Sequence, residues 1–193
     1  MADKGARGRS VQTEVQLISR EGRPQSLHPP SKPDMVSSEK KLIEIEANDS
    51  KEKGIWDKYL FSKIIGKGGF SVVISLCDKK TREIVAAKVV DKNKLNKDTL
   101  RLLQDEPEIL RKLSHHAIIP LLDFVESDKR LFIFLEYMKG GDLSRLIKDR
   151  QKDRRYFKEA EIQTVMMRLL QALQFIHSRG IIHRDIKPGT SLV

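Results

Sequence analysis

Residues 59–91, YLFSKIIGKGGFSVVISLCDKKTREIVAAKVVD, decide the fold of this chain. Three runs rich in Ile, Val, Phe and Tyr are separated by a glycine-containing turn and by the polar segment DKKTRE, residues 78–83. Such runs predict β-strands over residues 59–68, 71–78 and 84–91. Because the connections between them are short, the three strands are expected to form an antiparallel meander.

The segments after residue 91 extend this sheet and add one helix to it. Residues 96–116 place Leu and Ile on one side at helical spacing and predict a helix. The apolar runs 118–127 and 130–138 predict two further strands, joined by a short polar turn. The result is an expected five-stranded sheet with one helix inserted after the third strand.

Downstream of the sheet the pattern becomes helical. Asp142 follows two glycines and is a natural N-cap for a short helix. Residues 157–180 carry apolar side chains at positions i, i+3, i+4 and i+7, which predicts a long amphipathic helix. Gly180 follows the last apolar position, where a C′ glycine commonly ends a helix.

The N-terminal part of the chain has a different composition. Residues 1 to about 54 contain no aromatic residue, and four of their prolines lie close together, namely Pro24, Pro29, Pro30 and Pro33. Such a segment cannot bury enough apolar surface to offset the entropy of ordering it. We therefore expect an α+β protein with a disordered tail over residues 1–55, order beginning near Trp56, a β-rich lobe over 56–138 and a helical segment over 139–193.

Charge and cysteine content limit the class of protein. The net charge is +10, and nearly all of the basic excess lies after residue 58. Cys77 is the single cysteine, so an intrachain disulfide is impossible, which fits a reducing compartment. The N-terminus lacks the apolar core of a secretory signal, and no apolar run is long enough to cross a bilayer. These features predict a cytoplasmic or nuclear protein that does not bind a membrane.

The basic run KDRQKDRRYFK, residues 148–158, is interpreted as a solvated connection between two helices, and its alternative is a docking patch for acidic partners. It lacks the interleaved aromatic residues and fold signals of a nucleic-acid binder, so no nucleic-acid partner is expected. Cys77 is expected to be a buried strand residue, and His115 and His116 to end a helix rather than to bind a metal ion.

Two features of the predicted sheet point to phosphate chemistry. IGKGGFSVV, residues 65–73, is a glycine-rich turn whose backbone N–H groups can approach phosphate oxygens. The next element is a strand and not a helix, which argues against a dinucleotide-binding fold. Lys88 lies on the strand after this turn and needs an anionic partner. The following helix offers Glu106, and because Pro107 comes next, Glu108 is a rival.

With LEYM (135–138) and HRDIKP (183–188), these motifs follow one another in the order found in eukaryotic protein kinases. Over residues 59–188 the chain resembles that family, in its serine/threonine branch. The resemblance implies an ATP-binding small lobe and the first helices of a large lobe. The reaction that the resemblance implies is transfer of the γ-phosphate of ATP to Ser or Thr of a protein substrate.

The resemblance also implies which residues contact the cofactor. Lys88 would bind the α/β-phosphates, and Val73 and Ala86 would enclose the adenine. Leu135 would guard the back of the pocket, whereas Asp142 matches an acidic position near the ribose besides being an N-cap. The full set implied for ATP is Ile65, Gly66, Gly68, Gly69, Phe70, Ser71, Val73, Ala86, Lys88, Glu106, Glu136, Met138 and Asp142, with Glu136 and Met138 acting through their backbone.

In the same way the resemblance assigns catalytic roles to the HRDIKP segment. Asp185 would orient the substrate hydroxyl and accept its proton, and Lys187 would neutralise the transferred phosphoryl group. His183 is expected to brace the loop, and Arg184 to meet a phosphorylated activation segment.

The end of the sequence departs from the family pattern. Gly189 and Thr190 stand where the family has two residues ending in a Mg²⁺-binding Asn, and no Asp-Phe-Gly sequence follows. ATP with Mg²⁺ is the family expectation, but most metal ligands are missing. We therefore expect the truncated chain to have little or no phosphotransferase activity. The alternative is a non-catalytic nucleotide-binding or protein-interaction module, with a partner on the exposed face of the helix at 159–179.

Overall fold

The computed structural model describes residues 17–18 and 49–192 of the 193-residue chain. Contacts between Cα atoms divide the chain into two compact units. The described part of the sheet unit comprises residues 49–96 and 121–137. The described part of the helical unit comprises residues 17–18, 97–120 and 138–192.

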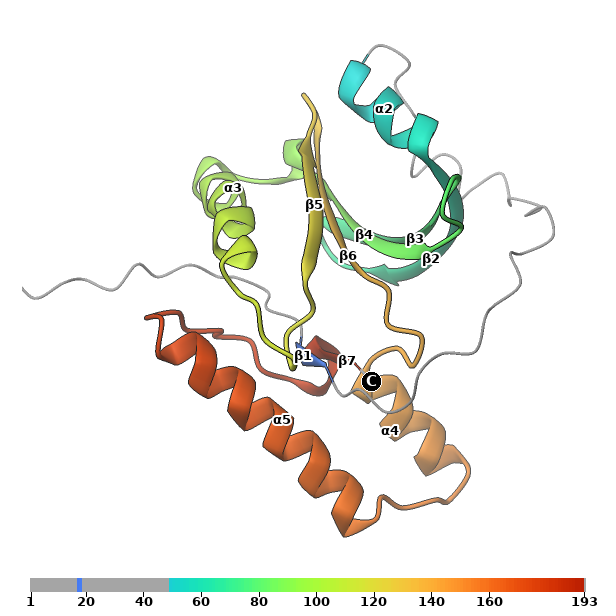
Figure 1. Cartoon of the computed structure of the whole chain (residues 1–193), viewed down its shortest axis with the longest axis vertical. Coiled ribbons are helices and arrows are strands. Elements are labelled where there is room, and N and C mark those ends of the chain that lie inside the picture. The colour runs from blue at the N-terminus through green and yellow to red at the C-terminus, as the bar shows by residue number, and fades with distance from the viewer. Residues whose placement is uncertain (1–16, 19–48, 193) are drawn as a thin grey trace, which may run out of the picture. The chain divides into compact units, whose positions relative to one another are not determined.

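The sheet unit contains the predicted five-stranded antiparallel sheet, with the strand order β2-β3-β4-β6-β5 (Figure 1). A short 3-10 turn, Lys92–Lys94, follows β4. The strand bounds are Tyr59–Lys67 for β2, Ser71–Asp78 for β3, Ile84–Asp91 for β4, Leu121–Glu126 for β5 and Arg130–Glu136 for β6.

The predicted strands are confirmed with small changes at their ends. The run 118–127 becomes a strand only from Leu121, directly after Pro120, which has no N–H to donate to a ladder. The polar turn between β3 and β4 is also confirmed. There the Asp78 carboxylate accepts hydrogen bonds from the backbone N–H groups of Lys80 and Thr81, at 2.8 and 3.0 Å.

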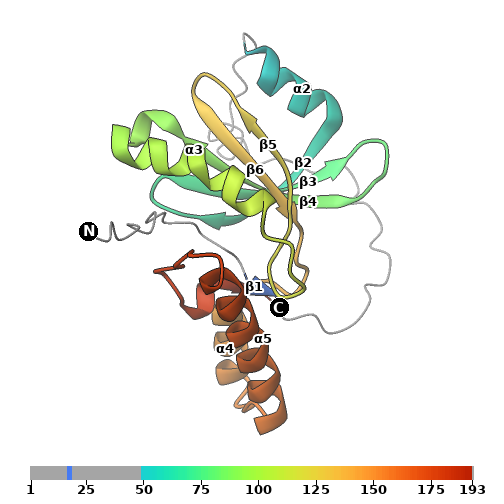
Figure 2. The ribbon, with the colours of Figure 1, turned by 60° about the vertical axis from the view of Figure 1, so that its left-hand side comes forward.

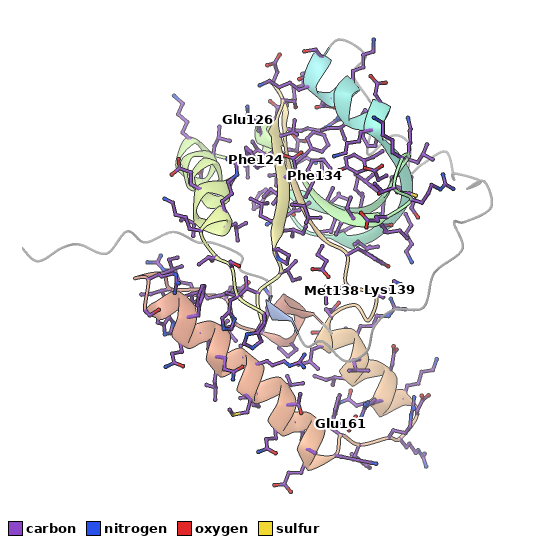
Figure 3. All side chains as sticks on the ribbon, viewed as in Figure 1. Phe124, Glu126, Phe134, Met138, Lys139 and Glu161 are labelled. Atoms are coloured by element: carbon purple, nitrogen blue, oxygen red, sulfur yellow. The ribbon has the colours of Figure 1, made fainter. Side chains whose placement is uncertain are left out.

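One face of the sheet forms a hydrophobic core with helix α2, Ser50–Lys58, which leads directly into β2 (Figure 2). Because side chains alternate along a strand, this face receives every second residue of β3, β4 and β6. Tyr59 stacks on Phe134 with ring centroids 5.3 Å apart. Figure 3 labels Phe134 on β6. The buried members of this cluster are Ile55, Tyr59, Ile74, Leu76, Val85, Ala87, Phe132 and Phe134.

The start of α2 corrects the expectation that residues up to 55 form a disordered tail. Asp49 caps the helix, with Oδ1 accepting hydrogen bonds from the N–H groups of Lys51 and Glu52 at 2.9 and 3.2 Å. Ile55 is buried in the core. Removal of its apolar side chain from water stabilises the turn of α2 that precedes Trp56. The expected tail residues 1–16 and 19–48 lie outside the described part of the chain.

In the helical unit, α3 extends over Lys97–Arg111, so it ends five residues earlier than expected. Pro107 lies inside the helix, which therefore does not begin after this residue. His115 and His116 follow α3 rather than end it. The His115 ring lies 4.7 Å from that of Phe175, and His116 Nε2 is 3.1 Å from Gln171 Oε1. Both partners belong to α5, which lies in the same unit as these two histidines.

Two further helices have the predicted positions. Helix α4 spans Leu143–Lys152, and the Asp142 carboxylate caps it by accepting a hydrogen bond from Arg145 N–H at 2.9 Å. Helix α5 spans Glu159–His177. Gly180 has a positive φ of 72° and donates to His177 O at 2.9 Å, while the next N–H, of Ile181, donates to Ile176 O at 3.0 Å. This is the expected glycine-terminated helix end.

The last described residues form a 3-10 turn, Pro188–Thr190, and the strand β7, Ser191–Leu192. Strand β7 pairs in parallel with β1, Leu17–Ile18, in a two-stranded ladder. Among the helices that the structure describes, none has the length and apolar character needed to cross a membrane.

Candidate active site

The glycine-rich turn joins β2 to β3 and is held closed by backbone hydrogen bonds. Gly68 N–H donates to Ser71 O at 2.8 Å, and Asp91 N–H at the end of β4 donates to Phe70 O at 3.2 Å. A Cβ atom on Gly68 would lie 3.2 Å from Ser71 Oγ, whereas one on Gly69 would meet nothing within 4 Å. A side chain at position 68 would thus be tight against the Ser71 hydroxyl group, whereas Gly69 is not required by packing.

The tip of this turn exposes apolar side chains. Phe70 is 58% exposed, and Ile65, beside a register shift in β2, is also exposed. A large aromatic ring gains nothing from exposure in water. Its position on the turn suits a side chain that covers a bound molecule.

The second face of the sheet, opposite the α2 core, gathers the other candidate residues of this unit. Val73 pairs with Lys88 across β3 and β4, and Ala86 pairs with Leu135 across β4 and β6. Lys88 also pairs with Ile133. The side chains of this patch therefore lie next to one another on one face of the sheet, with the Lys88 cation among them, and they are Val73, Ala86, Lys88, Ile133 and Leu135. Gly66 pairs with Val73 at the end of this patch that leads to the glycine-rich turn.

Lys88 is only 8% exposed. A buried ammonium group needs an anionic or polar partner, because its desolvation is otherwise very costly. Glu108, the rival partner, has a side chain that is 80% exposed and that lies 4.0 Å from Lys112 Nζ on the same helix. Glu106, the other candidate partner of Lys88, occupies the position on α3 directly before Pro107.

The chain leaves the sheet through the LEYM segment, residues 135–138. Glu136 is the last residue of β6, and Met138 and Lys139 follow it (Figure 3). Met138 O accepts a hydrogen bond from Gly141 N–H at 3.3 Å, and Gly141 has a φ of 76°. The positive φ explains why glycine precedes the N-cap Asp142.

The HRDIKP segment forms a braced loop in the helical unit. His183 is 2% exposed, and its Nδ1 accepts a hydrogen bond from Asp185 N–H at 3.2 Å. Arg184 between them has a φ of 66°, a strained conformation for a residue with a side chain. Lys187 Nζ lies 2.6 Å from Asp185 Oδ2. The expectation that His183 braces the loop is confirmed, and the fold brings Asp185 and Lys187 into contact.

A metal centre is not assembled by the described residues. Within residues 17–18 and 49–192, no group of three or more His, Cys, Asp and Glu side chains is placed to hold a metal ion. The Gly189 position lies beside α4, where an added Cβ would be 3.7 Å from Ser144 Oγ. Cys77 is buried in β3, as expected.

Sequence reasoning missed a polar cluster at the start of α2. Asp49 and Glu52 hold the turn between β5 and β6 through Ser127, Asp128 and Arg130. The signal was present, because an acidic N-cap followed three positions later by Glu, just before an apolar pair, is typical of a helix start.

Comparison with known proteins identifies the family. A family model described as the protein kinase domain matches residues 59–193. A probable myosin light chain kinase of Dictyostelium discoideum is 38% identical over 135 residues, which cover 70% of this chain and 41% of that protein. The probable serine/threonine-protein kinase fhkD of the same organism is 39% identical over 138 residues, covering 70% of this chain and 18% of that protein.

The serine/threonine-protein kinase ULK3 of Homo sapiens is 38% identical over 138 residues, covering 71% of this chain and 28% of that protein. The chain thus spans less than half the length of each of these relatives. The matched segment contains the whole sheet, the glycine-rich turn, Lys88 and the HRDIKP loop. The chain belongs to the eukaryotic protein kinase family, in its serine/threonine branch.

Proposed function

We propose that the second face of the sheet unit binds ATP, and that the chain contributes this site and the HRDIKP loop to phosphorylation of Ser or Thr in a protein substrate. The supporting observation is Lys88, a buried cation in register with Val73 on the face that leads to the glycine-rich turn. A buried ammonium group beside exposed backbone amides suits a polyphosphate.

Each part of this face has a role in the proposal. Backbone N–H groups of the turn from Gly66 to Ser71, other than that of Gly68, which donates to Ser71 O, approach the phosphates, and Phe70 and Ile65 cover them. Lys88 neutralises the α/β-phosphates. The small Ala86 side chain, beside Val73, leaves room for the flat adenine ring, whose edge meets the backbone of Glu136 and Met138. Asp142, the N-cap of α4, is assigned to the ribose by the family resemblance.

For the partner of Lys88 we propose Glu106. The Glu108 side chain is exposed and points towards Lys112. To pair with Lys88, Glu108 would have to adopt another rotamer and give up Lys112. The spacing of Glu106 to Ile109, Leu110 and His115 in the sequence matches the family pattern and favours Glu106 over Glu108.

The proposed chemistry at the HRDIKP loop is a single displacement. The substrate hydroxyl oxygen forms a bond to the γ-phosphorus, the bond from that phosphorus to the β,γ-bridging oxygen breaks, and ADP leaves. The hydroxyl proton passes to the Asp185 carboxylate, and the Lys187 ammonium offsets charge on the transferred group. Mg²⁺, when bound to ATP, supplies further neutralisation of the phosphate charge.

The polypeptide of residues 1–193 is expected to bind ATP but to transfer phosphate poorly. Gly189 and Thr190 replace the segment that ends in a metal-binding Asn, and residues 1–193 contain no Asp-Phe-Gly sequence. The second candidate function is a nucleotide-binding module that acts through protein contacts, and the departure at Gly189 and Thr190 favours it. The exposed apolar side chains of α5, Ile162, Met166, Met167 and Leu170, are the candidate surface for such a partner.

Titration with a fluorescent ATP analogue tests the nucleotide site. Lys88→Met is expected to weaken binding at least about tenfold, because the phosphates lose a charge-assisted contact. Lys63→Met is the matched control, since Lys63 is exposed on β2 and its loss is expected to leave affinity unchanged. Failure of the unaltered chain to bind ATP, or equal losses in the two variants, would contradict the proposal.

A further inference from the structure

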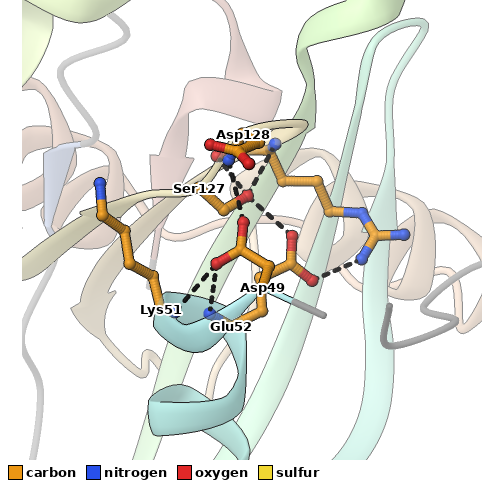
Figure 4. Close-up of polar contacts among 6 residues, drawn as sticks. Asp49, Lys51, Glu52, Ser127 and Asp128 are labelled. Atoms are coloured by element: carbon orange, nitrogen blue, oxygen red, sulfur yellow. Dashed lines mark hydrogen bonds and ion pairs between the residues drawn. The ribbon is translucent and has the colours of Figure 1, made fainter. Parts of the chain in front are cut away.

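A carboxylate at the start of α2 joins this helix to the turn between β5 and β6 (Figure 4). Asp49 Oδ1 caps α2, and Asp49 Oδ2 accepts a hydrogen bond from Asp128 N–H at 3.0 Å. These hydrogen bonds, with that from Asp128 as the largest cause, lower the pKa of Asp49 below its usual value. One side chain therefore organises both the helix start and a turn 79 positions later.

Glu52, one turn into α2, makes the second connection. Its Oε1 accepts a hydrogen bond from Ser127 Oγ at 2.7 Å, and its Oε2 lies 2.8 Å from the Arg130 guanidinium. Glu52 is only 2% exposed. A carboxylate buried to this extent is tolerated only where both oxygens are paired, and here each oxygen has a partner.

The turn that these carboxylates hold is itself tightly closed. Ser127 Oγ accepts a hydrogen bond from Arg130 N–H at 2.9 Å, and Ser127 N–H donates to Arg130 O at 2.9 Å. Lys92, just after β4, donates to Ser127 O at 3.0 Å and pairs with Glu126 at 2.8 Å. The four residues Asp49, Glu52, Ser127 and Arg130, called here the α2 lock, thus connect α2 to the end of β5 and the start of β6.

Strand β6 carries this connection to the proposed nucleotide face. It begins at Arg130 in the α2 lock and ends at Glu136, whose backbone is proposed to meet the adenine edge. Between them, Ile133 and Leu135 pair with Lys88 and Ala86. The segment that the family model matches begins at Tyr59, so the two acidic residues of the lock lie before that segment.

We propose that Glu52 and Arg130 are positioning residues for the nucleotide site: through the α2 lock, the segment before the kinase domain sets the placement of β6 and hence the affinity for ATP. This inference rests on the proposed ATP site. A displacement of Arg130 is transmitted along β6 to Leu135 and Glu136. The reason is that the hydrogen-bonded ladder with β4 holds β6 in a small number of packed positions. Linkage makes the effect reciprocal, so bound nucleotide must favour the closed lock.

Affinity measurements on the 193-residue chain test the inference. Glu52→Gln keeps the size of the side chain and an acceptor for Ser127 but removes the charge that faces Arg130. It is expected to weaken binding of a fluorescent ATP analogue about threefold or more. Ile74→Val, in the core of the same unit, is the control for lost stability and is expected to leave affinity within about twofold.

A double-mutant cycle shows whether the effect passes through this ion pair. Arg130→Gln is expected to weaken binding as much as Glu52→Gln, and the double variant is expected to lose no more than either single variant. Arg130→Lys keeps the charge and is expected to restore part of the affinity. Additive losses, or losses equal to that of Ile74→Val, would overturn the proposal.

Hydrogen exchange on the unaltered chain gives a readout that does not depend on a variant folding. Added ATP analogue is expected to slow exchange of the amides of α2 and of residues 127–131, and Trp56, the single tryptophan, is expected to change its fluorescence. If the chain binds nucleotide while these amides and Trp56 do not respond, the lock proposal fails and the ATP site stands. If the chain binds no nucleotide, the proposed function fails and the lock proposal fails with it.

Discussion

At the scale of single residues, Glu161 has the most strongly perturbed acid–base equilibrium among the groups for which the structure resolves a shift. The Arg150 guanidinium donates to both of its oxygens, at 2.8 and 2.6 Å, and Lys158 N–H donates to Oε2 at 2.8 Å. Figure 3 labels Glu161 near the start of α5. These contacts, Arg150 first, lower the pKa of Glu161 from 4.5 to about 2.

This pKa predicts how the helical unit responds to acid. Because the folded-state pKa lies below the ordinary value, the carboxylate stabilises the unit above about pH 4.5, and this contribution is lost as the pH falls towards 2. An NMR titration of Glu161 is expected to show its midpoint near the low value. In Arg150→Gln the midpoint is expected to move back towards 4.5. An unchanged midpoint would show that Arg150 is not the cause.

At the scale of elements, α4 and α5 end in the same backbone geometry with different residues. Arg154 after α4 has a φ of 53°, and Gly180 after α5 has a φ of 72°. Arg155 N–H donates to Arg150 O at 2.8 Å, as Ile181 N–H does to Ile176 O at 3.0 Å. The left-handed conformation suits glycine and strains a residue with a Cβ atom, so α4 carries strain that α5 avoids.

Exchanging residue types at these two ends is expected to change stability in opposite directions. Arg154→Gly is expected to stabilise the helical unit by about 0.5 to 1 kcal/mol, because glycine removes the strain. Gly180→Ala is expected to destabilise it by about 1 kcal/mol by introducing the same strain, although space around Gly180 is open.

Thermal unfolding followed by circular dichroism measures both effects. Arg154→Ala serves as a control, since it removes the charge and keeps the Cβ atom; it is expected to change stability far less than Arg154→Gly. Destabilisation by Arg154→Gly would refute this explanation of the α4 end.

At the scale of the whole molecule, the chain leaves apolar surface exposed on α5. Ile162, Met166 and Leu170 are spaced four residues apart, so they lie on one side of the helix, and all three are exposed. On another side, Ala172 and Ile176 are fully buried. A helix with apolar residues on both sides is typical of an element that packs against more than one neighbour.

This surface predicts self-association of the 193-residue polypeptide. Light scattering after size-exclusion chromatography is expected to find oligomers or aggregates. Replacing Met166 by Lys and Leu170 by Glu is expected to increase the monomer fraction, because both side chains are exposed and neither supports the core. Substituting exposed Gln151 of α4 by Lys adds charge on another helix and is the control. A monodisperse unaltered chain with a sharp unfolding transition would contradict the expectation.

Local patterns in the sequence were sufficient for most elements of the fold. Apolar runs rich in β-branched and aromatic residues located the five strands, Asp142 located the start of α4, and Gly180 located the end of α5. The predictions were wrong at element boundaries that depend on more than the local apolar pattern. Pro120 delays β5, and α2 extends six residues before Trp56.

The candidate site was predicted as a set of residue types in order, and its arrangement was not. Sequence placed Lys88, Asp185 and Lys187 on a strand and a loop through the family resemblance. It could not show that Lys88 is buried in register with Val73, or that Lys187 lies 2.6 Å from Asp185. Strand register and side-chain pairing depend on packing between segments, which one-dimensional spacing does not contain.

The sequence by itself determined the family, most of the strands and helices and the residue types of the candidate site, because these depend on spacing between near neighbours along the chain. Only the tertiary structure decided the α2 lock. Its contacts join residues 75 and 78 positions apart, Glu52 with Ser127 and with Arg130. The physical reason is burial: a carboxylate that loses water must find donors in space, and folding selects which distant segment supplies them.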